Sequence, residues 1–184
     1  QEFESLQARH FQDIIIFTMF EVAALYKFSK ILDPFKTHNS IRSKLKDLSV
    51  YGTILVGGEG LNGTISAANK KNLSDAISFL KQINGFDDLD IKYSSSNKNP
   101  FVRLKVKLKK EIVTIGDESI DPTVEAGEYL NPNEWNKLLE DDETILIDTR
   151  NNYEYSIGTF KKSINPNTNK FREFPKWLEK QKFS

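Results

Sequence analysis

Cysteine is absent from the 184 residues, and histidine occurs only twice, at His10 and His38. Without cysteine the chain can form no disulfide bond, no thiolate nucleophile and no zinc site built on sulfur. The two histidines are far apart and match no metal-ligand spacing, so we interpret both as surface residues and expect no metal site.

Long apolar runs are also missing, and none approaches the roughly 20 residues that a membrane-spanning helix requires. The run from Ile14 to Phe20 lacks the basic flank and the small-residue cleavage site of a signal peptide. These absences favour a cytoplasmic protein with no membrane partner. The single methionine, Met19, precedes the first regular pattern, so we expect it to be the native start and residues 1–18 to be an upstream, non-native extension.

Net charge is zero in sum, with 26 basic and 26 acidic residues, but the charges are unevenly placed. Residues 1–110 carry 17 lysines and arginines against 11 acids, residues 111–148 carry 1 against 12, and residues 149–184 carry 8 against 3. The zero sum therefore does not argue against an anionic partner.

Residues 101–110, FVRLKVKLKK, alternate apolar and cationic side chains, which predicts a strand with one buried face and one row of positive charge. Alternate residues of a strand lie about 6.6 Å apart, a spacing comparable to that of successive phosphates. Alternatively, lysines on an edge strand prevent edge-to-edge aggregation. The candidates for contact with a nucleic-acid backbone are Arg103, Lys105, Lys107, Lys109 and Lys110.

The pattern of residues 22–110 predicts an α+β fold of the ferredoxin-like type, βαββαβ plus one strand, with two helices on one face of the sheet. The register that would place the cationic row relative to the uncovered face is not fixed by sequence. We predict strands at 22–32, 53–56, 64–67, 89–95 and 101–110, and helices at 34–48 and 69–83, the second with Asn69 as its N-cap and Leu73, Ile77 and Leu80 on its apolar face.

The glycine-rich segment 57–63, GGEGLNG, is open to two interpretations. A phosphate-binding loop should lead directly into a helix, and the Gly-Lys-Ser/Thr of a Walker loop is absent. We therefore favour a β-hairpin, with Asn62-Gly63 supplying the positive φ angles of its turn, over direct ligand contact.

A second pattern follows an acidic segment. We predict a helix at 131–140, a strand at 145–147 that ends in Asp148-Thr149-Arg150, and a helix at 174–181. A helix, a strand and a helix cannot close an α/β layer, so this second region is expected to be incomplete.

Three separated motifs carry a family resemblance. Residues 145–166, ILIDTRNNYEYSIGTFKKSINP, resemble the start of a rhodanese domain. This motif with its continuation FREFP (171–175), together with the motifs GTILVGGEGLNGTISA (52–67) and FVRLKVKLKKEIVT (101–114), resembles the bacterial rhodanese-related family of tRNA uridine hydroxylases, over about residues 22 to 181.

The resemblance implies a ferredoxin-like domain followed by a rhodanese domain. Together with the residue patterns, it divides the chain into an extension at 1–18, a ferredoxin-like domain at 19–112, a linker at 113–130 and an incomplete rhodanese domain at 131–184. It implies tRNA as the partner, not DNA, and oxygen-dependent conversion of the wobble uridine to 5-hydroxyuridine, with molecular oxygen as co-substrate and no other cofactor evident. The catalytic cysteine of the family is expected beyond Ser184, so these 184 residues alone are predicted to be inactive.

Three further residues are candidates for support of an active site, namely Asp148, Arg150 and Arg172. Alternatively, Arg150 pairs with Asp148 or Glu154, and Arg172 pairs with Glu173, for structural reasons.

Two other functions compete with the hydroxylase interpretation. In one, the chain is the scaffold part of a generic rhodanese sulfurtransferase. In the other, the ferredoxin-like fold acts as an acylphosphatase, which is disfavoured because residues 32–39 contain neither the arginine nor the glycines of a phosphate cradle.

Overall fold

The computed structural model describes residues 19–116, 124 and 127–183. The predicted extension at residues 1–18, including His10, lies outside the described residues, and so do residues 117–123 and 125–126 of the predicted linker.

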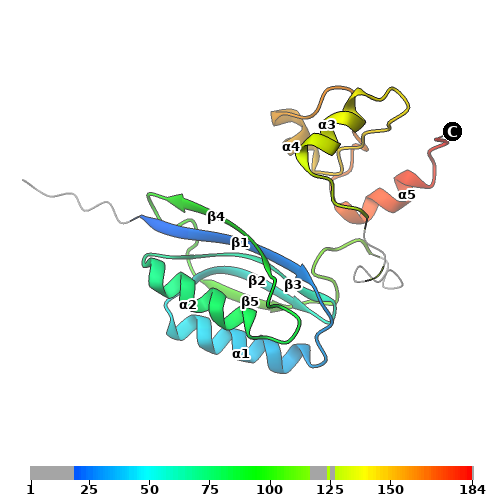
Figure 1. The fold of residues 1–184 in the computed structure, drawn as a ribbon. Coiled ribbons are helices and arrows are strands. Elements are labelled where there is room, and N and C mark those ends of the chain that lie inside the picture. The colour runs from blue at the N-terminus through cyan, green and yellow to red at the C-terminus, as the bar shows by residue number, and fades with distance from the viewer. Residues whose placement is uncertain (1–18, 117–123, 125–126, 184) are drawn as a thin grey trace, which may run out of the picture.

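The first part of the chain folds into seven elements: β1 (Phe20–Phe28), α1 (Pro34–Asp47), β2 (Tyr51–Gly57), β3 (Gly60–Ala67), α2 (Lys70–Lys81), β4 (Asp90–Ser96) and β5 (Leu104–Leu108). The strands form one sheet in the order β4-β1-β3-β2-β5, and both helices cover the same face (Figure 1). All neighbouring strands are antiparallel except β5, which joins β2 in parallel. The predicted ferredoxin-like fold with one additional strand is confirmed.

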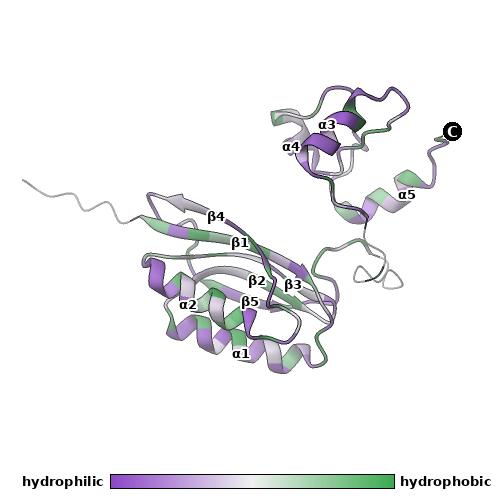
Figure 2. Cartoon of the chain, viewed as in Figure 1, coloured by the Kyte–Doolittle hydropathy of each residue, from purple (hydrophilic) through white to green (hydrophobic). Residues whose placement is uncertain are grey.

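Both helices begin at capping side chains and turn an apolar stripe toward the sheet. Asp33 caps α1 and Asn69 caps α2, each accepting a hydrogen bond from a backbone N–H of the first turn, at 2.9 and 2.7 Å. Figure 2 shows hydrophilic and hydrophobic residues alternating along both helices, as an amphipathic pattern requires. The predicted apolar face of α2 is buried, as are Ile41 and Leu45 of α1.

The hydrophobic core lies between the sheet and the two helices. Burial of one such aliphatic or aromatic side chain stabilises a fold by about 1.5–3 kcal/mol, so this layer supplies most of the driving force for folding. The fully buried members are Ala23, Ile41, Leu45, Ile54, Val56, Leu61, Ile65, Ala67, Ala76, Leu80 and Phe86.

The β2–β3 hairpin turns at Gly58 and Glu59, because Gly57 and Gly60 are its last paired residues. The predicted hairpin is confirmed, but the prediction that Asn62-Gly63 forms its turn is wrong, since both residues lie within β3. A Cβ atom at Gly63 would lie 2.3 Å from the carbonyl oxygen of Thr53 on β2. Close contact between strands, rather than turn geometry, therefore requires this glycine.

The cationic strand is shorter than predicted. Only residues 104–108 form β5, and the expected apolar face is incomplete because Val102 and Leu108 are 96% and 48% exposed. The side-chain oxygen of Asn99 accepts a hydrogen bond from the backbone N–H of Phe101 at 3.1 Å, which holds the preceding residues in a turn. Leu104 and Val106 alone pack against the core.

The second region contains α3 (Pro132–Glu140), α4 (Asn152–Ile157), a 3-10 turn (Phe171–Glu173) and α5 (Phe174–Leu178). The predicted helix at 131–140 is confirmed, and the final helix ends at Leu178 instead of Gln181. The predicted strand at 145–147 is reduced to one parallel bridge between Ile147 and Ile164. Among the described residues, no extended segment pairs with it over a greater length. Nowhere in the described parts of the chain is a helix long and apolar enough to cross a membrane.

Candidate nucleic-acid interface

The sheet face opposite the helices, here called the open face, is defined by strand pairing. Residues that alternate with the buried core positions point to this side. Its members are Phe20, Val22, Ala24, Tyr26 and Phe28 of β1, Tyr51, Thr53 and Leu55 of β2, Asn62, Thr64 and Ser66 of β3, Asp90, Lys92, Ser94 and Ser96 of β4, and Lys105 and Lys107 of β5. Residues 132–178 lie on the same side of the sheet (Figure 1).

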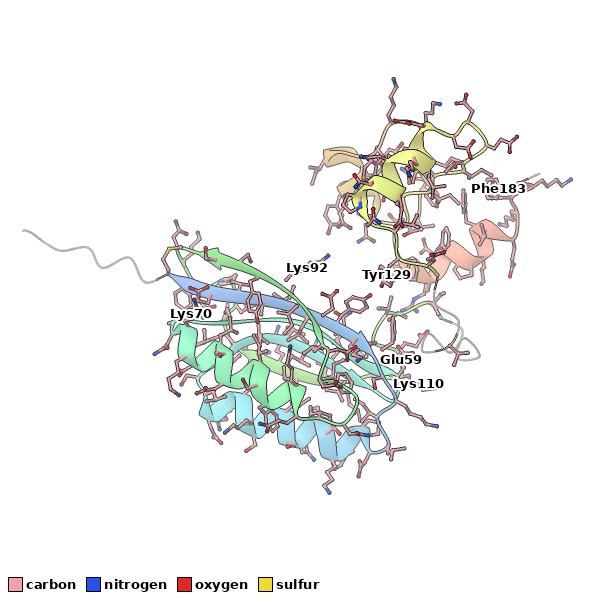
Figure 3. All side chains as sticks on the ribbon, in the orientation of Figure 1. Glu59, Lys70, Lys92, Lys110, Tyr129 and Phe183 are labelled. Atoms are coloured by element: carbon pink, nitrogen blue, oxygen red, sulfur yellow. The ribbon has the colours of Figure 1, made fainter. Side chains whose placement is uncertain are left out.

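One row of side chains crosses the open face and has a cation at each end. Lys105 is opposite Thr53, Thr53 is opposite Thr64, Thr64 is opposite Ala24, and Ala24 is opposite Lys92. With neighbouring strands about 4.8 Å apart, the two terminal Cα atoms are separated by about 19 Å. Figure 3 shows Lys92 on the side of the sheet away from the helices.

The structure thus places Lys105 and Lys107 on the open face, which the sequence alone could not decide. Both lysines are exposed. Sequence reasoning missed Lys92, because only the pairing of β4 with β1 shows that it shares a face with the lysines of β5.

The remaining cationic candidates flank β5. Arg103 precedes the strand, and Lys109 and Lys110 follow it, all three with exposed side chains. The backbone N–H of Lys109 donates to the Val56 carbonyl at 2.8 Å, so this residue continues along the edge of the sheet. Since β5 is an edge strand, its position also fits the alternative that the lysines prevent edge pairing.

Each end of the open face is partly covered. At one end the connection from β4 to β5 crosses it, and the Ser66 hydroxyl donates to the side-chain oxygen of Asn99 at 2.9 Å. At the other end the hydroxyl groups of Tyr26 and Tyr129 share a hydrogen bond. This bond raises the pKa of Tyr26 to about 12, so the phenol stays neutral at physiological pH. The middle row therefore runs between Lys105 on the β5 edge and Lys92 on the β4 edge, and the β4 edge also carries the acid Asp90.

Aromatic stacking is not the main chemistry of this face. The row from Lys105 to Lys92 in the middle of the face contains no aromatic side chain, whereas Phe20, Tyr26 and Phe28 of β1 and Tyr51 of β2 lie toward its ends, where Tyr26 is bonded to Tyr129. RNA-binding sheets that read bases do so through aromatic residues on such strands. Contact through phosphates, which carries little sequence information, suits the arrangement better.

His38 is not simply a surface residue. The ring is half-buried, and its Nε2 atom lies 3.1 Å from the carbonyl oxygen of Val106 on the edge strand. The other ring nitrogen lies 3.0 Å from the side-chain oxygen of Asn39. The His38 ring therefore pairs with a backbone carbonyl group on the outer edge of β5. This contact protects part of the exposed sheet edge.

Asp148 and Arg150 form a two-pronged ion pair. Arg150 donates from Nε to Oδ1 of Asp148 at 2.9 Å and from Nη2 to Oδ2 at 2.6 Å, and again from Nη2 to the Gly158 carbonyl at 2.7 Å. The bonds from Arg150, with a further one from Thr159, hold the pKa of Asp148 well below its usual range. The predicted pairing of Arg150 with Asp148 is present, and the two opposite charges lie against each other.

Arg172 does not form its predicted pair. The Glu173 carboxylate instead accepts a hydrogen bond from the backbone N–H of Asn169 at 3.0 Å. The Arg172 side chain is exposed. A Cβ atom added at Gly116 would lie 3.3 Å from the Cβ atom of Arg172. Arg172 is therefore brought close to the segment that leaves the ferredoxin-like domain.

The segment after β1 forms no phosphate cradle. The backbone N–H groups of Ser29 and Ile31 donate to the carbonyls of Glu59 and Gly58, each at 2.9 Å, and Asp33 occupies the first turn of α1. A phosphate would need these donors free. Among the described residues, no cluster of three or more histidine, aspartate or glutamate side chains could hold a metal ion.

Comparison with known proteins identifies the family of the chain. The sequence profile of the family described as the UPF0176 acylphosphatase like domain matches residues 20–112, half of the chain. The chain belongs to the UPF0176 family. A solved acylphosphatase from Coxiella burnetii is 9% identical, with a TM-score of 0.36 over 49% of this chain and 94% of that one, a likeness too slight to bear on chemistry.

Three similar proteins are named tRNA uridine(34) hydroxylase, as the sequence resemblance predicts. The protein from Bartonella quintana is 46% identical over 88% of this chain and 53% of its own length. The proteins from Legionella pneumophila and Acinetobacter baumannii are 42% and 45% identical over 86% and 87% of this chain, and 62% and 50% of their own lengths. The chain thus spans little more than half the length of these relatives.

Proposed function

We propose that this chain is the tRNA-holding part of a tRNA uridine hydroxylase, which converts the wobble uridine to 5-hydroxyuridine. The observation that carries the proposal is the row across the open face with Lys105 at one edge and Lys92 at the other. The names of the relatives supply the reaction and the substrate class. They favour this reading over a sulfurtransferase scaffold.

The cations act on the RNA backbone. Lysines at both edges neutralise phosphates of a strand that crosses the sheet, and the small side chains Ala24, Thr53 and Thr64 let that strand approach closely. Each neutralised phosphate of single-stranded RNA releases counterions, which makes binding sensitive to salt. The face selects RNA by charge and shape rather than by base sequence.

The chemical step is supplied from outside these residues. The chain has no cysteine, and Asp148 and Arg150 are bonded to each other. Residues 131–184 are the first part of a rhodanese domain, residues 113–130 are the linker, and the catalytic cysteine of the family lies elsewhere in the enzyme. Molecular oxygen is the co-substrate and the cytoplasm is the compartment.

A triple variant tests the proposal. Replacing Lys92, Lys105 and Lys107 by alanine should raise the Kd for tRNA about tenfold or more at moderate salt, and should lower the slope of log Kd against log salt by about 2. Fluorescence anisotropy with labelled tRNA measures both quantities.

A matched control removes the same charge from the helices. Arg42, Lys44 and Lys70 are exposed on α1 and α2, and the control replaces them by alanine. This variant should bind tRNA within about twofold of the parent, apart from a small long-range effect of net charge. Equal losses in both variants, or no loss in the first, would show that the open face is not the binding surface.

A further inference from the structure

The glycine-rich hairpin carries a carboxylate, Glu59. The proposed contact with RNA phosphates gives this negative charge no role. The hairpin instead receives a residue from beyond β5. Ile112 is 2% exposed, and Cβ atoms added at Gly57 and Gly60 would lie 3.1 and 3.0 Å from its side chain. The two glycines therefore leave the space that Ile112 fills.

Side chains of the hairpin bind both backbone polar groups of Ile112. Its N–H donates to Oε1 of Glu59 at 2.5 Å, and its carbonyl accepts a hydrogen bond from Nδ2 of Asn62 at 3.0 Å. Figure 3 shows Glu59 and Lys110 at the same end of the sheet. Since a buried backbone group must find a partner, Glu59 and Asn62 make burial of Ile112 possible. We call Glu59, Asn62 and Ile112 the clasp.

Contacts continue from the clasp to the second region. The Glu111 carboxylate accepts hydrogen bonds from the N–H groups of Ile115 and Gly116, at 3.2 and 2.9 Å, and so closes a tight loop. Gly116, with a φ of 85°, lies against Arg172. No described helix or strand of residues 132–178 packs against one of residues 20–108. The path through the clasp, together with the bond between Tyr26 and Tyr129, connects the two regions.

We infer that the glycine-rich hairpin is an anchor for the interdomain segment, and that Glu59 and Asn62 are positioning residues that hold the second region on the open-face side of the sheet. The clasp stands on its own geometry, whereas its purpose rests on the proposed function: it keeps the catalytic half of the enzyme over the bound tRNA. This explains an acid and a run of glycines next to a cationic strand.

Hydrogen exchange of the Ile112 amide tests the clasp. Glu59→Ala removes the acceptor and should accelerate this exchange about 5- to 100-fold, whereas Glu59→Gln keeps an acceptor oxygen and should stay close to the parent. Slow exchange of the Ile54 amide in β2 checks that the domain remains folded. Glu140→Ala, at an exposed residue of α3, is the control. An unchanged Ile112 rate in a folded Glu59→Ala variant overturns the inference.

A distance measurement tests the positioning role. Because the chain has no cysteine, Ser74→Cys on α2 and Lys137→Cys on α3 place two dyes without competing thiols. Glu59→Ala and Asn62→Ala should broaden the distance distribution between the dyes, and Glu59→Gln should not. An unchanged distribution overturns the positioning role. tRNA affinity of the same samples separates the two proposals, since a parent chain that binds no tRNA refutes the function but leaves both clasp readouts intact.

Discussion

The ferredoxin-like domain and the region from residue 127 to 183 are built in different ways. In the first, eleven side chains without solvent exposure form a continuous core. In the second, Pro166 and Thr168 are the buried residues, the helices bury none, and two enclosed polar atoms, Nε1 of Trp135 and Oδ1 of Asn152, lack a partner. A buried apolar core holds the first region, whereas local polar bonds and aromatic contacts between partly exposed rings hold the second.

This difference predicts unequal sensitivity to substitution, and the two regions can be followed separately. Both tryptophans, Trp135 and Trp177, lie in the second region, so their fluorescence reports its unfolding. Far-UV circular dichroism is dominated by the helices and strands of the first region.

Truncation of the core should have the largest effect. Ile54→Ala removes a fully buried side chain and should lower the free energy of unfolding of the first region by about 2–5 kcal/mol. Leu138→Ala, at a residue 41% exposed on α3, should cost less than about 1 kcal/mol. Urea denaturation followed by both signals provides the measurement. Similar losses for the two variants would remove the contrast between the regions.

Alanine substitutions at glycine positions should also differ in their cost to stability, by less than the core truncation does. Gly63→Ala places a Cβ against the Thr53 carbonyl and should destabilise the first region by about 2 kcal/mol or more. No atom lies within 4 Å of a Cβ at Gly58 or at Gly158, so alanine at either position should leave stability nearly unchanged. A tolerant Gly63 would mean that the β2–β3 contact is less tight than described. Thermal unfolding of the three variants decides this.

The ion pair of the second region should have the smallest effect, visible in acid. Because Arg150 lowers the folded-state pKa of Asp148, the pair contributes fully above the unfolded carboxyl value of about 4, and this stability is lost as the pH falls further. Asp148→Asn should cost about 1–2 kcal/mol at pH 7 and reduce the acid dependence. Urea midpoints from tryptophan fluorescence at pH 7, 5 and 3 measure it. If the urea midpoint of the variant falls with pH as much as that of the parent, Asp148 is not the source of the pH dependence.

Sequence reasoning succeeded where the structure depends on near neighbours. The cap of α2 at Asn69, the stripe of Leu73, Ile77 and Leu80, and the Asp148–Arg150 pair all join residues within one element or turn. The three family motifs also predicted the similarity to the relatives named above.

Sequence reasoning missed the features that depend on strand pairing or on distant residues. The turn at Gly58-Glu59, the alignment of Lys92 with Lys105 and the clasp at Ile112 arise from strand register and from contacts across about 50 positions of the chain. No local pattern encodes such pairings, because register is fixed by packing between strands. The identity of the uncovered face was therefore available only from the fold.

Oxidative footprinting with tRNA tests the central claim most directly, since it compares the two faces of one domain in one sample. Hydroxyl radicals modify exposed aromatic and aliphatic side chains, and mass spectrometry locates the products. Tyr51 and Leu55 lie on the open face, whereas Leu32 and Phe35, 88% and 66% exposed, lie beyond β1 and on α1. Bound tRNA should protect Tyr51 and Leu55 and leave Leu32 and Phe35 unchanged. Protection of Leu32 and Phe35 with Tyr51 and Leu55 still reactive would contradict RNA binding at the open face.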